Sequence, residues 1–285
     1  MSQKPDPKKA NPLVNFTPPS KEFVKKLIAP LKFYFSPSFY GMDNLDSTRP
    51  ALYITNHTVF GVTDGTLFGA EMYLKKDIFL MSLVDKAHFN VPFWRDIIPK
   101  IGFINGSREA CAELMRQKKN ILVYPGGARE TCKLKGEKYK LTWKKRTGFA
   151  RMAIEFGYDI VPVTSIGGDD AYDIHYDSED IMSSPAGKFL ELTGLAKRFF
   201  KNGEEIPPIA TGIGITSLPK PVKLYIKYGK RISTKALQGK EDDKDVLWSL
   251  RNKVEDAMNE QFEELFAIRK VDKDKSPLRR FLEGI

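Results

Sequence analysis

Cysteine and histidine are scarce in this sequence, which has two cysteines and three histidines among 285 residues. Cys111 and Cys132 are isolated from each other and from the histidines, so no segment has the ligand spacing of a zinc site. Two isolated cysteines indicate free thiols in a reducing compartment. The sequence also lacks a Gly-x-Ser-x-Gly segment, the turn that carries the nucleophile of many serine hydrolases. We therefore expect neither a bound metal nor a serine hydrolase.

Long apolar runs are absent as well. No stretch reaches the roughly 18 unbroken apolar residues that a membrane-spanning helix needs. Residues 1–19 are rich in proline, lysine and asparagine and lack the apolar core of a signal peptide. We expect these residues to form a mobile leader. We also expect a cytoplasmic protein whose contact with membranes is peripheral.

Acidic residues are outnumbered, with 36 Asp and Glu against 46 Lys and Arg, which gives a net charge of +10. Such a charge suits a polyanionic partner, which is a nucleic acid, an anionic membrane surface or a phosphate-bearing carrier. The sequence contains no recognisable nucleic-acid-binding motif and no cluster of aromatic and basic residues. We therefore expect no nucleic-acid partner.

The length fits one large domain or two small ones, and because no internal repeat or linker divides the chain we expect one domain with terminal extensions. We divide it into a basic leader with an amphipathic helix (1–37), a central domain (38–235), and a C-terminal helix with a charged tail (236–285). Ser20 is a suitable N-cap for the first helix, which ends near Phe35. Its apolar stripe consists of Phe23, Leu27, Ile28, Leu31 and Phe35. This helix either lies in a lipid interface or packs on its own domain.

Strands and helices alternate between residues 50 and 166, which predicts an α/β fold with a mostly parallel central sheet flanked by helices. The predicted strands are 51–55, 77–84, 101–104, 121–124 and 159–164. Further helices are expected at 190–200 and 245–267. The segment 89–98 has apolar residues at helical spacing and is interpreted as core.

The most informative segment joins the end of a predicted strand to a predicted helix. It contains Asn56 and His57 and then Asp64, which opens the helix. A histidine titrates near neutral pH and can take a proton from an alcohol. An aspartate that accepts from the other ring nitrogen would fix the tautomer of the imidazole. The alternative is ordinary loop chemistry, with Asp64 as an N-cap.

Two other polar segments follow predicted strands. Arg108 comes after one strand, and the loop 126–130 comes after another. In a parallel sheet the carboxyl ends of the strands meet at one edge, where active sites lie. We therefore expect both segments to lie beside His57. The remaining charged loops have a simpler interpretation as solvated surface. They contain Lys133, Lys135, Lys138, Lys140, Asp169 and Asp170.

Four segments resemble the motifs of the glycerolipid acyltransferase superfamily, in the same order and with similar separations. The first is Asn56-His57 with Asp64, and the second is Gly102-Phe103-Ile104 with Arg108. The third is Tyr124-Pro125-Gly126-Gly127-Ala128-Arg129-Glu130, and the fourth is Ile160-Val161-Pro162-Val163. The third motif is most similar to the diacylglycerol acyltransferase and phytyl-ester-synthase branch.

The resemblance implies a single acyltransferase domain that moves a fatty acyl group to a lipid hydroxyl. It implies acyl-CoA or acyl-carrier protein as the donor, no other cofactor, and a lipid acceptor at a membrane surface. His57 would be the general base and Asp64 its orienting carboxylate. Asn56, Arg108, Gly126, Gly127, Arg129 and Glu130 would contact substrate.

Two departures from the family pattern bear on these assignments. Six residues separate His57 from Asp64 where four are usual, and glycine stands at position 126 where the family often has glutamate. A glycine there lets backbone N–H groups approach a phosphate or an oxyanion closely. The altered spacing leaves a second possibility, a non-catalytic lipid-binding or lipid-transfer protein on the same scaffold.

Overall fold

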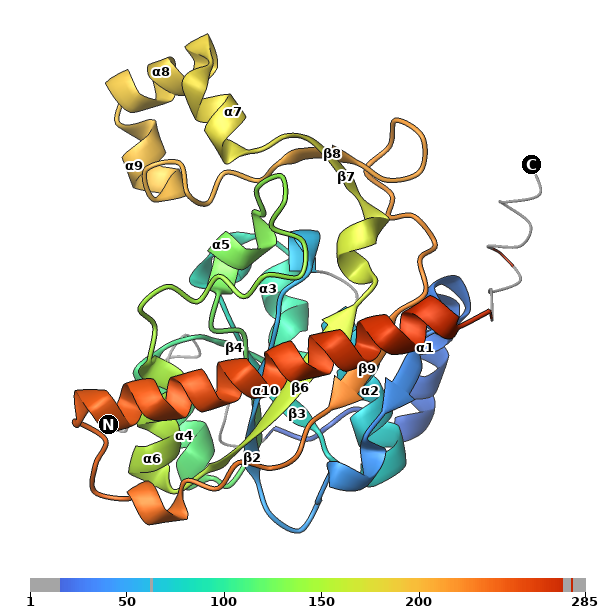
Figure 1. The fold of residues 1–285 in the computed structure, drawn as a ribbon, viewed down its shortest axis with the longest axis vertical. Coiled ribbons are helices and arrows are strands. Elements are labelled where there is room, and N and C mark those ends of the chain that lie inside the picture. The colour runs from blue at the N-terminus through green and yellow to red at the C-terminus, as the bar shows by residue number, and fades with distance from the viewer. Residues whose placement is uncertain (1–15, 62–63, 274–277, 279–285) are drawn as a thin grey trace, which may run out of the picture.

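The computed structural model describes residues 16–61, 64–273 and 278. Most of the predicted leader and the end of the predicted tail therefore lie outside the described residues. The described chain forms one central sheet with helices on both faces (Figure 1). A smaller lobe lies beyond the carboxyl ends of the parallel strands. The predicted fold class, α/β with a mostly parallel sheet, is confirmed.

The central sheet has the strand order β1-β9-β6-β2-β5-β3-β4 within the described residues. Its strands are β1 (Ser38–Tyr40), β2 (Ala51–Thr55), β3 (Leu80–Val84), β4 (Phe103–Asn105), β5 (Asn120–Val123), β6 (Asp159–Ile166) and β9 (Tyr225–Tyr228). All neighbouring strands pair in parallel except β6 and β9, which are antiparallel. Every residue of β2 is buried, as expected for a central parallel strand covered on both faces.

The helices are α1 (Lys21–Phe35), α2 (Asp64–Lys76), α3 (Trp94–Ile97), α4 (Arg108–Arg116), α5 (Gly127–Thr131), α6 (Gly148–Phe156), α7 (Ser178–Ser183), α8 (Pro185–Leu192), α9 (Leu195–Phe200) and α10 (Lys244–Val271). Capping residues in the local sequence set the ends of several of these helices. The Ser20 side chain accepts a hydrogen bond from the N–H of Phe23, and Ser107 caps α4 in the same way. Gly157 ends α6 in the left-handed conformation, where glycine has no Cβ to clash.

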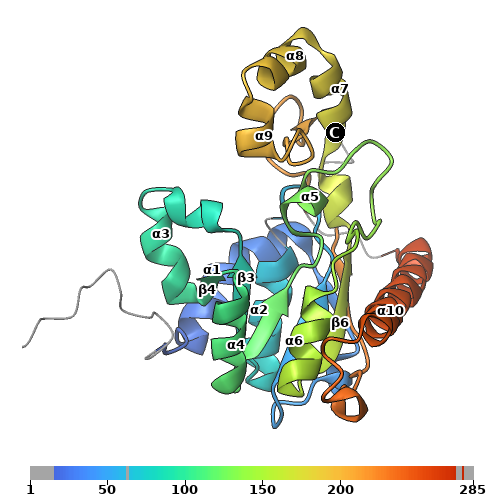
Figure 2. The same cartoon turned by 90° about the vertical axis from the view of Figure 1, so that its left-hand side faces the viewer.

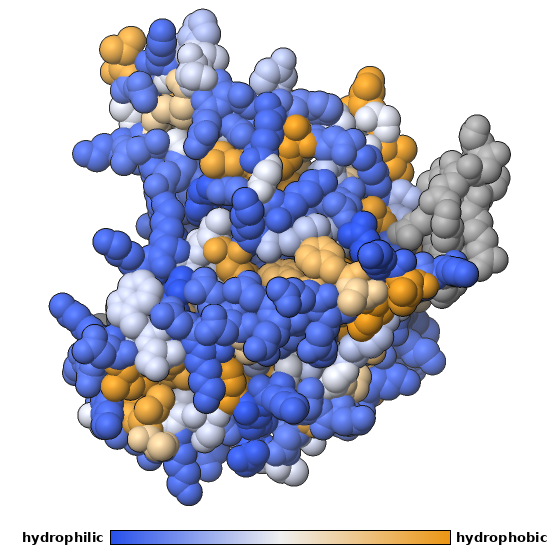
Figure 3. Space-filling model, viewed as in Figure 1, coloured by the Kyte–Doolittle hydropathy of each residue, from blue (hydrophilic) through white to orange (hydrophobic). Residues whose placement is uncertain are grey.

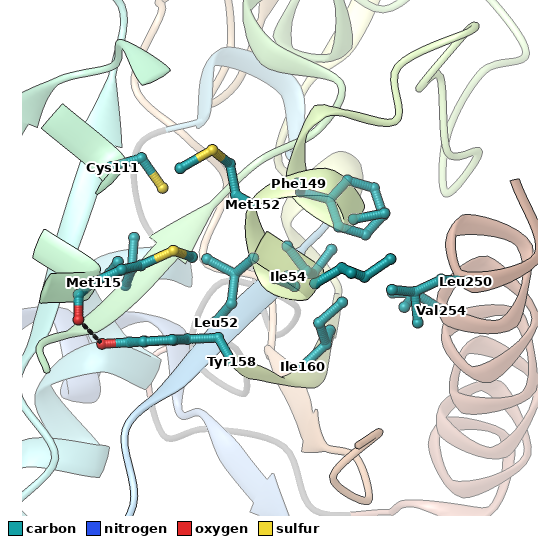
Figure 4. Packing of buried hydrophobic residues seen from close by; sticks show 14 of the residues in the cluster. Leu52, Ile54, Cys111, Met115, Phe149, Met152, Tyr158, Ile160, Leu250 and Val254 are labelled. Carbon is teal, nitrogen blue, oxygen red and sulfur yellow. Dashed lines mark hydrogen bonds between the residues drawn. The ribbon is translucent and has the colours of Figure 1, made fainter. Parts of the chain in front are cut away.

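Two sets of helices cover the two faces of the sheet. One face packs against α1 and α2, through side chains such as Ile28, Leu67 and Phe68. The other packs against α4, α6 and α10, and Figure 4 shows Met115, Met152, Leu250 and other core residues of this layer around Leu52, Ile54 and Ile160. The Tyr158 hydroxyl donates to the carbonyl of Met115 at 3.0 Å, which satisfies its polar end within the core.

The smaller lobe lies between β6 and β9 in the sequence. It contains the strands β7 (Asp173–Tyr176) and β8 (Ile209–Thr211), which pair antiparallel, and the helices α7, α8 and α9. Figures 1 and 2 show it projecting past the carboxyl end of the parallel strands, above α5. The single helix expected at 190–200 is wrong, because Thr193 and the left-handed Gly194 separate α8 from α9.

Two apolar segments differ from their predicted burial. In α1, Ile28 and Phe35 are buried as expected, whereas Phe23 and Leu27 are more than half exposed. The prediction that 89–98 is core is wrong, since this segment is mostly exposed and only Ile98 is fully buried. None of the helices in the described part of the chain combines the length and apolar character needed to cross a lipid bilayer.

Candidate active site

The predicted site segments meet at the carboxyl edge of the parallel strands. β2 pairs in parallel with β5 and β6, so His57 after β2 lies beside the loop that follows β5. A cavity of about 760 Å³ opens at this edge. Its lining includes His57, Tyr124, Gly127, Arg108 from α4 and Trp94 from α3. The volume is in the range of pockets that hold a small organic ligand.

His57 is held by its neighbours on several sides. Its imidazole ring stacks on the ring of Tyr124, with centroids 3.7 Å apart and an interplanar angle of 12°. A Cβ on Gly61, whose φ is +63°, would lie 2.8 Å from His57 Nδ1, so glycine allows the loop to close over that nitrogen. Burial, helped by the charge of Lys133, lowers the pKa of His57 to about 3. The imidazole is therefore neutral at neutral pH.

The Asn56 side chain links the strands β2 and β6 just beyond the last backbone pairing between them. Its Nδ2 donates to the carbonyl of Ser165 at 3.0 Å, and its Oδ1 accepts from the N–H of Ser165 at 2.9 Å. The side chain is buried. Both polar atoms of the amide are therefore bonded to β6, and this fixes the direction in which the chain leaves β2 toward His57.

Asp64 is the first residue of α2 and is fully buried. Its Oδ1 accepts from the N–H of Gly65 at 3.0 Å and from the Thr58 hydroxyl at 3.4 Å. Burial raises its pKa to about 6. Among the described residues neither Asp64 Oδ2 nor His57 Nδ1 has a hydrogen-bond partner, although both atoms are buried. Residues 62 and 63, which lie between His57 and Asp64 in the sequence, are outside the described residues.

The loop after β5 turns sharply into the short helix α5. A Cβ on Gly126 would lie 2.1 Å from Glu130 Oε2, so this position has room only for glycine while Glu130 keeps its place. Glu130 is fully buried, and its Oε1 accepts from the N–H of Thr142 at 3.4 Å. Burial raises its pKa to about 7, against the nearby charge of Lys133 and the N–H of His57, which favour the carboxylate.

Gly127 and its neighbours are supported by hydrogen bonds. The N–H of Gly127 donates to the carbonyl of Tyr124 at 3.0 Å. Arg146, which sequence reasoning did not single out, donates to the carbonyl of Pro125 at 2.8 Å. Ala128, in the first turn of α5, lines the cavity. The amides of a first helical turn lack intrahelical partners, which makes the Ala128 N–H a suitable donor to a developing negative charge.

The two candidate arginines have different surroundings. Arg129 is buried, and it donates to the carbonyl of Cys132 at 3.0 Å and to Glu137 at 2.8 Å. Arg108 lines the cavity, and its side chain is more than half exposed although it pairs with Glu155 at 2.9 Å. Its position leaves the guanidinium accessible to a ligand, whereas that of Arg129 is engaged within its own loop.

Sequence reasoning missed a buried ion pair beside this site. Lys133 and Asp169, interpreted as solvated, are both buried and lie 3.3 Å apart. Asp169 also accepts from the N–H of Val59 at 2.9 Å and of Tyr139 at 2.8 Å, so it joins the His57 loop to the lysine-rich loop. The available signal was position, since Asp169 follows the buried strand β6 at the same sheet edge as His57.

The other charged residues of these loops are closer to the surface. Asp170 is partly buried and pairs with Lys138 and Arg269. Lys135 pairs with Asp180, and Lys140 is exposed. In the ranges 16–61 and 64–273 no group of three or more His, Cys, Asp or Glu side chains is placed to bind a metal ion. An imidazole at the wall of a cavity, as His57 is, can take part in acid–base chemistry.

Comparison with known proteins supports the motif analysis. The family model for diacylglycerol acyltransferase matches residues 29–276. Phytyl ester synthase 2, chloroplastic, of Arabidopsis thaliana is 29% identical over 261 residues, which is 85% of this chain and 35% of that protein. Diacylglycerol O-acyltransferase 2B of Umbelopsis ramanniana is 35% identical over 95 residues, 33% of this chain and 27% of that protein. The chain thus spans about a third of the length of the curated relatives it matches.

A solved structure shares the fold. The crystal structure of the 1-acyl-sn-glycerophosphate (LPA) acyltransferase PlsC from Thermotoga maritima matches with a TM-score of 0.55 at 15% sequence identity. The match covers 90% of this chain and 81% of that one.

Proposed function

The chain belongs to the diacylglycerol acyltransferase family, and from this membership we propose that it transfers a fatty acyl group from a thioester to a lipid hydroxyl. The donor is acyl-CoA or an acyl-carrier protein. The acceptor is a lysophospholipid, a glycerolipid or a long-chain alcohol. The observation that carries this proposal is the position of the His57 imidazole, which stacks on Tyr124 at the wall of a cavity of about 760 Å³.

In the proposed reaction His57 acts as a general base. Since Nδ1 is enclosed beside Gly61, Nε2 is the nitrogen that takes the proton from the acceptor hydroxyl. The acceptor oxygen forms a bond to the thioester carbonyl carbon, and the carbonyl oxygen becomes an oxyanion that the Ala128 N–H stabilises. When the carbon–sulfur bond breaks, the thiolate leaves and takes the proton back from the imidazolium. An ester and a free thiol are the products.

The remaining candidate residues support this step. We assign Asp64 as the orienting carboxyl, because a hydrogen bond from His57 Nδ1–H to Asp64 Oδ2 would satisfy two buried atoms that otherwise lack partners. We assign Arg108 to the phosphate groups of the donor or acceptor. Asn56, Gly126, Gly127, Arg129 and Glu130 shape the site through contacts within the protein.

The proposed place of action is the surface of a membrane. Lipid acceptors reside there, and a net charge of +10 attracts the chain to anionic headgroups. Cys111 and Cys132 are free and buried, which fits a reducing compartment, for which we propose the cytoplasm.

A non-catalytic lipid-binding protein is the second candidate, favoured by the missing hydrogen bond between His57 and Asp64. The deciding measurement is thiol release from acyl-CoA by the purified chain against a panel of lipid alcohols, with His57→Ala alongside. Release that requires one acceptor and falls about 10²- to 10⁴-fold in His57→Ala supports the enzyme. If the chain binds lipid but releases no thiol from either acyl-CoA or acyl-carrier protein, the lipid-binding protein is supported.

A further inference from the structure

The segment around α3 exposes apolar side chains at the surface. Val91, Phe93, Trp94 and Ile97 are all exposed, and Phe93 is 84% exposed. Phe93 also has a φ of +63°, a left-handed conformation that costs free energy in a bulky residue. Figure 2 shows α3 standing away from the sheet, on the side opposite α10. We call these four side chains the α3 surface.

The α3 surface has a defined local structure. The N–H of Arg95 donates to the carbonyl of Val91 at 3.0 Å, and the N–H of Asp96 donates to that of Phe93 at 3.1 Å. Ile98, directly after α3, is fully buried and ties the segment to the core. A hydrogen-bonded, anchored turn that exposes four apolar side chains to water indicates an interaction surface.

The α3 surface is continuous with the cavity that contains His57. Trp94 from α3 and His88 just before it both line that cavity. An apolar partner that covers the α3 surface would therefore also border the cavity. A lipid could then enter without crossing water.

The charges around the α3 surface favour a lipid headgroup layer. Lys86, Arg95 and Lys100 are exposed, against the exposed Asp85 and Asp96, and Arg95 lies 4.0 Å from Asp96, so the excess is one positive charge. Apolar side chains flanked by basic ones are typical of segments that lie in a membrane interface. By contrast, hydrophilic side chains cover most of the face that carries α10 (Figure 3).

We propose that the α3 surface inserts into an anionic lipid surface and opens the cavity toward the lipid phase. The lipid nature of the substrate rests on the proposed function. The insertion itself is a binding event that can be measured without turnover.

The first test is sedimentation of the full chain with vesicles of phosphatidylcholine and phosphatidylglycerol. Phe93→Ser should weaken vesicle binding about tenfold, which corresponds to about 1.4 kcal/mol. The matched control is Val271→Ser, since Val271 is 75% exposed on α10, on the other side of the molecule. It should bind within twofold of the parent chain. Equal binding by Phe93→Ser and the parent chain would overturn the proposal.

A spectroscopic test places the segment in the lipid. Lipids brominated on the acyl chain should quench the fluorescence of the vesicle-bound chain, and Trp94→Phe should remove most of this quenching. Trp143 is buried and Trp248 lies on α10, so quenching that persists in Trp94→Phe would show that another surface is in contact. Loss of a dimer in Phe93→Ser during ultracentrifugation, with vesicle binding unchanged, would assign the α3 surface to a second copy of the chain and overturn the proposal.

A kinetic comparison separates this proposal from the proposed function. Phe93→Ser should lose about tenfold in rate on vesicle-borne acceptor and should keep the parent rate on a short-chain acceptor dissolved below its micelle concentration. A parent chain without acyl transfer, whose vesicle binding still falls in Phe93→Ser, would refute the activity and support the surface. Equal losses on both acceptors would refute the surface.

Discussion

Lys133 and Asp169 form an ion pair of 3.3 Å in which the two side chains are no more than 1% exposed. The pair connects the loop after α5 with the turn after β6. Through its bond to the N–H of Val59, Asp169 also holds the loop that carries His57. Taking two charges out of water is costly, so such a pair is tolerated only where each charge keeps its partner. We infer that the pair fixes the position of the His57 loop rather than adding net stability.

The first prediction concerns this pair. Lys133→Met and Asp169→Asn should each lower the free energy of unfolding by about 3 to 5 kcal/mol, because each leaves the other charge buried without its counter-charge. The double variant should lose clearly less than the sum of the two. Denaturant unfolding of the four proteins measures the coupling. The control cycle uses Glu113 and Arg116, an exposed pair 3.2 Å apart, where coupling should stay below about 0.5 kcal/mol. Strict additivity at Lys133 and Asp169 would contradict the pairing.

The second prediction concerns the turn after β5. Gly126 has a φ of −68°, which alanine also adopts, so Gly126→Ala tests space alone. The new Cβ would meet Glu130 and displace it, which should destabilise the fold by about 1 to 3 kcal/mol and slow turnover about 10²-fold by shifting the site. Gly148→Ala is the control, because a Cβ there meets nothing within 4 Å. It should be neutral or slightly stabilising. Parent-level turnover in Gly126→Ala would show that a Cβ at position 126 does not displace Glu130 in a way that disturbs the site.

Much of the site was predictable because its residues follow strands. A buried parallel strand is recognisable in the sequence as a short apolar run. The carboxyl ends of parallel strands lie along the same side of the sheet, so the segments that follow them are neighbours. His57, Arg108 and the loop 126–130 were placed correctly beside one edge for this reason. The family resemblance read from the four motifs is confirmed by the family model.

The errors arise where distant partners decide burial. Lys133 and Asp169 are 36 positions apart, and nothing near either residue in the sequence announces the other. The segment 89–98 has the spacing of a buried helix, but only Ile98 reaches the core, and α3 is four residues long. Periodicity reports which side chains share a face, and it does not report whether that face meets protein, water or lipid.

The third prediction separates the two arginines. Arg108→Ala should raise the KM for acyl-CoA about tenfold while leaving the melting temperature nearly unchanged, since the side chain is exposed and lines the cavity. The KM for an acyl-pantetheine thioester, which lacks the nucleotide phosphates, should not change. Arg116→Ala on the same helix, outside the cavity lining, is the control and should keep both constants.

Arg129→Ala should behave in the opposite way. It removes two hydrogen bonds of a buried guanidinium and leaves the Glu137 carboxylate without its counter-charge, so the free energy of unfolding should fall by about 2 to 4 kcal/mol. At a temperature where the variant is folded, its KM for acyl-CoA should equal that of the parent. A KM effect at Arg129 without loss of stability would assign the phosphate contact to Arg129 instead.

The last prediction concerns Asp64 and pH. Its folded-state pKa of about 6 lies above the usual aspartate value of about 3.9, so between these values the folded chain holds a proton that the unfolded chain has released. Stability from this group is therefore present at pH 4 and is lost as pH rises through 6, by roughly 3 kcal/mol. Asp64→Asn does not titrate. Relative to the parent it should gain about this amount between pH 4 and pH 7, as measured by denaturant unfolding.

Turnover of Asp64→Asn should fall although its stability rises. Asp64→Asn cannot stabilise the His57 imidazolium as a carboxylate does, so kcat should fall at least tenfold with little change in KM, even where the variant is the more stable protein. Asp173→Asn is the control, because Asp173 is exposed and Lys220 holds its pKa below the usual value. Its stability difference from the parent should be small and of opposite sign. A pH-independent stability difference in Asp64→Asn would show that the Asp64 carboxyl is satisfied in solution, and unchanged kcat would remove it from the reaction.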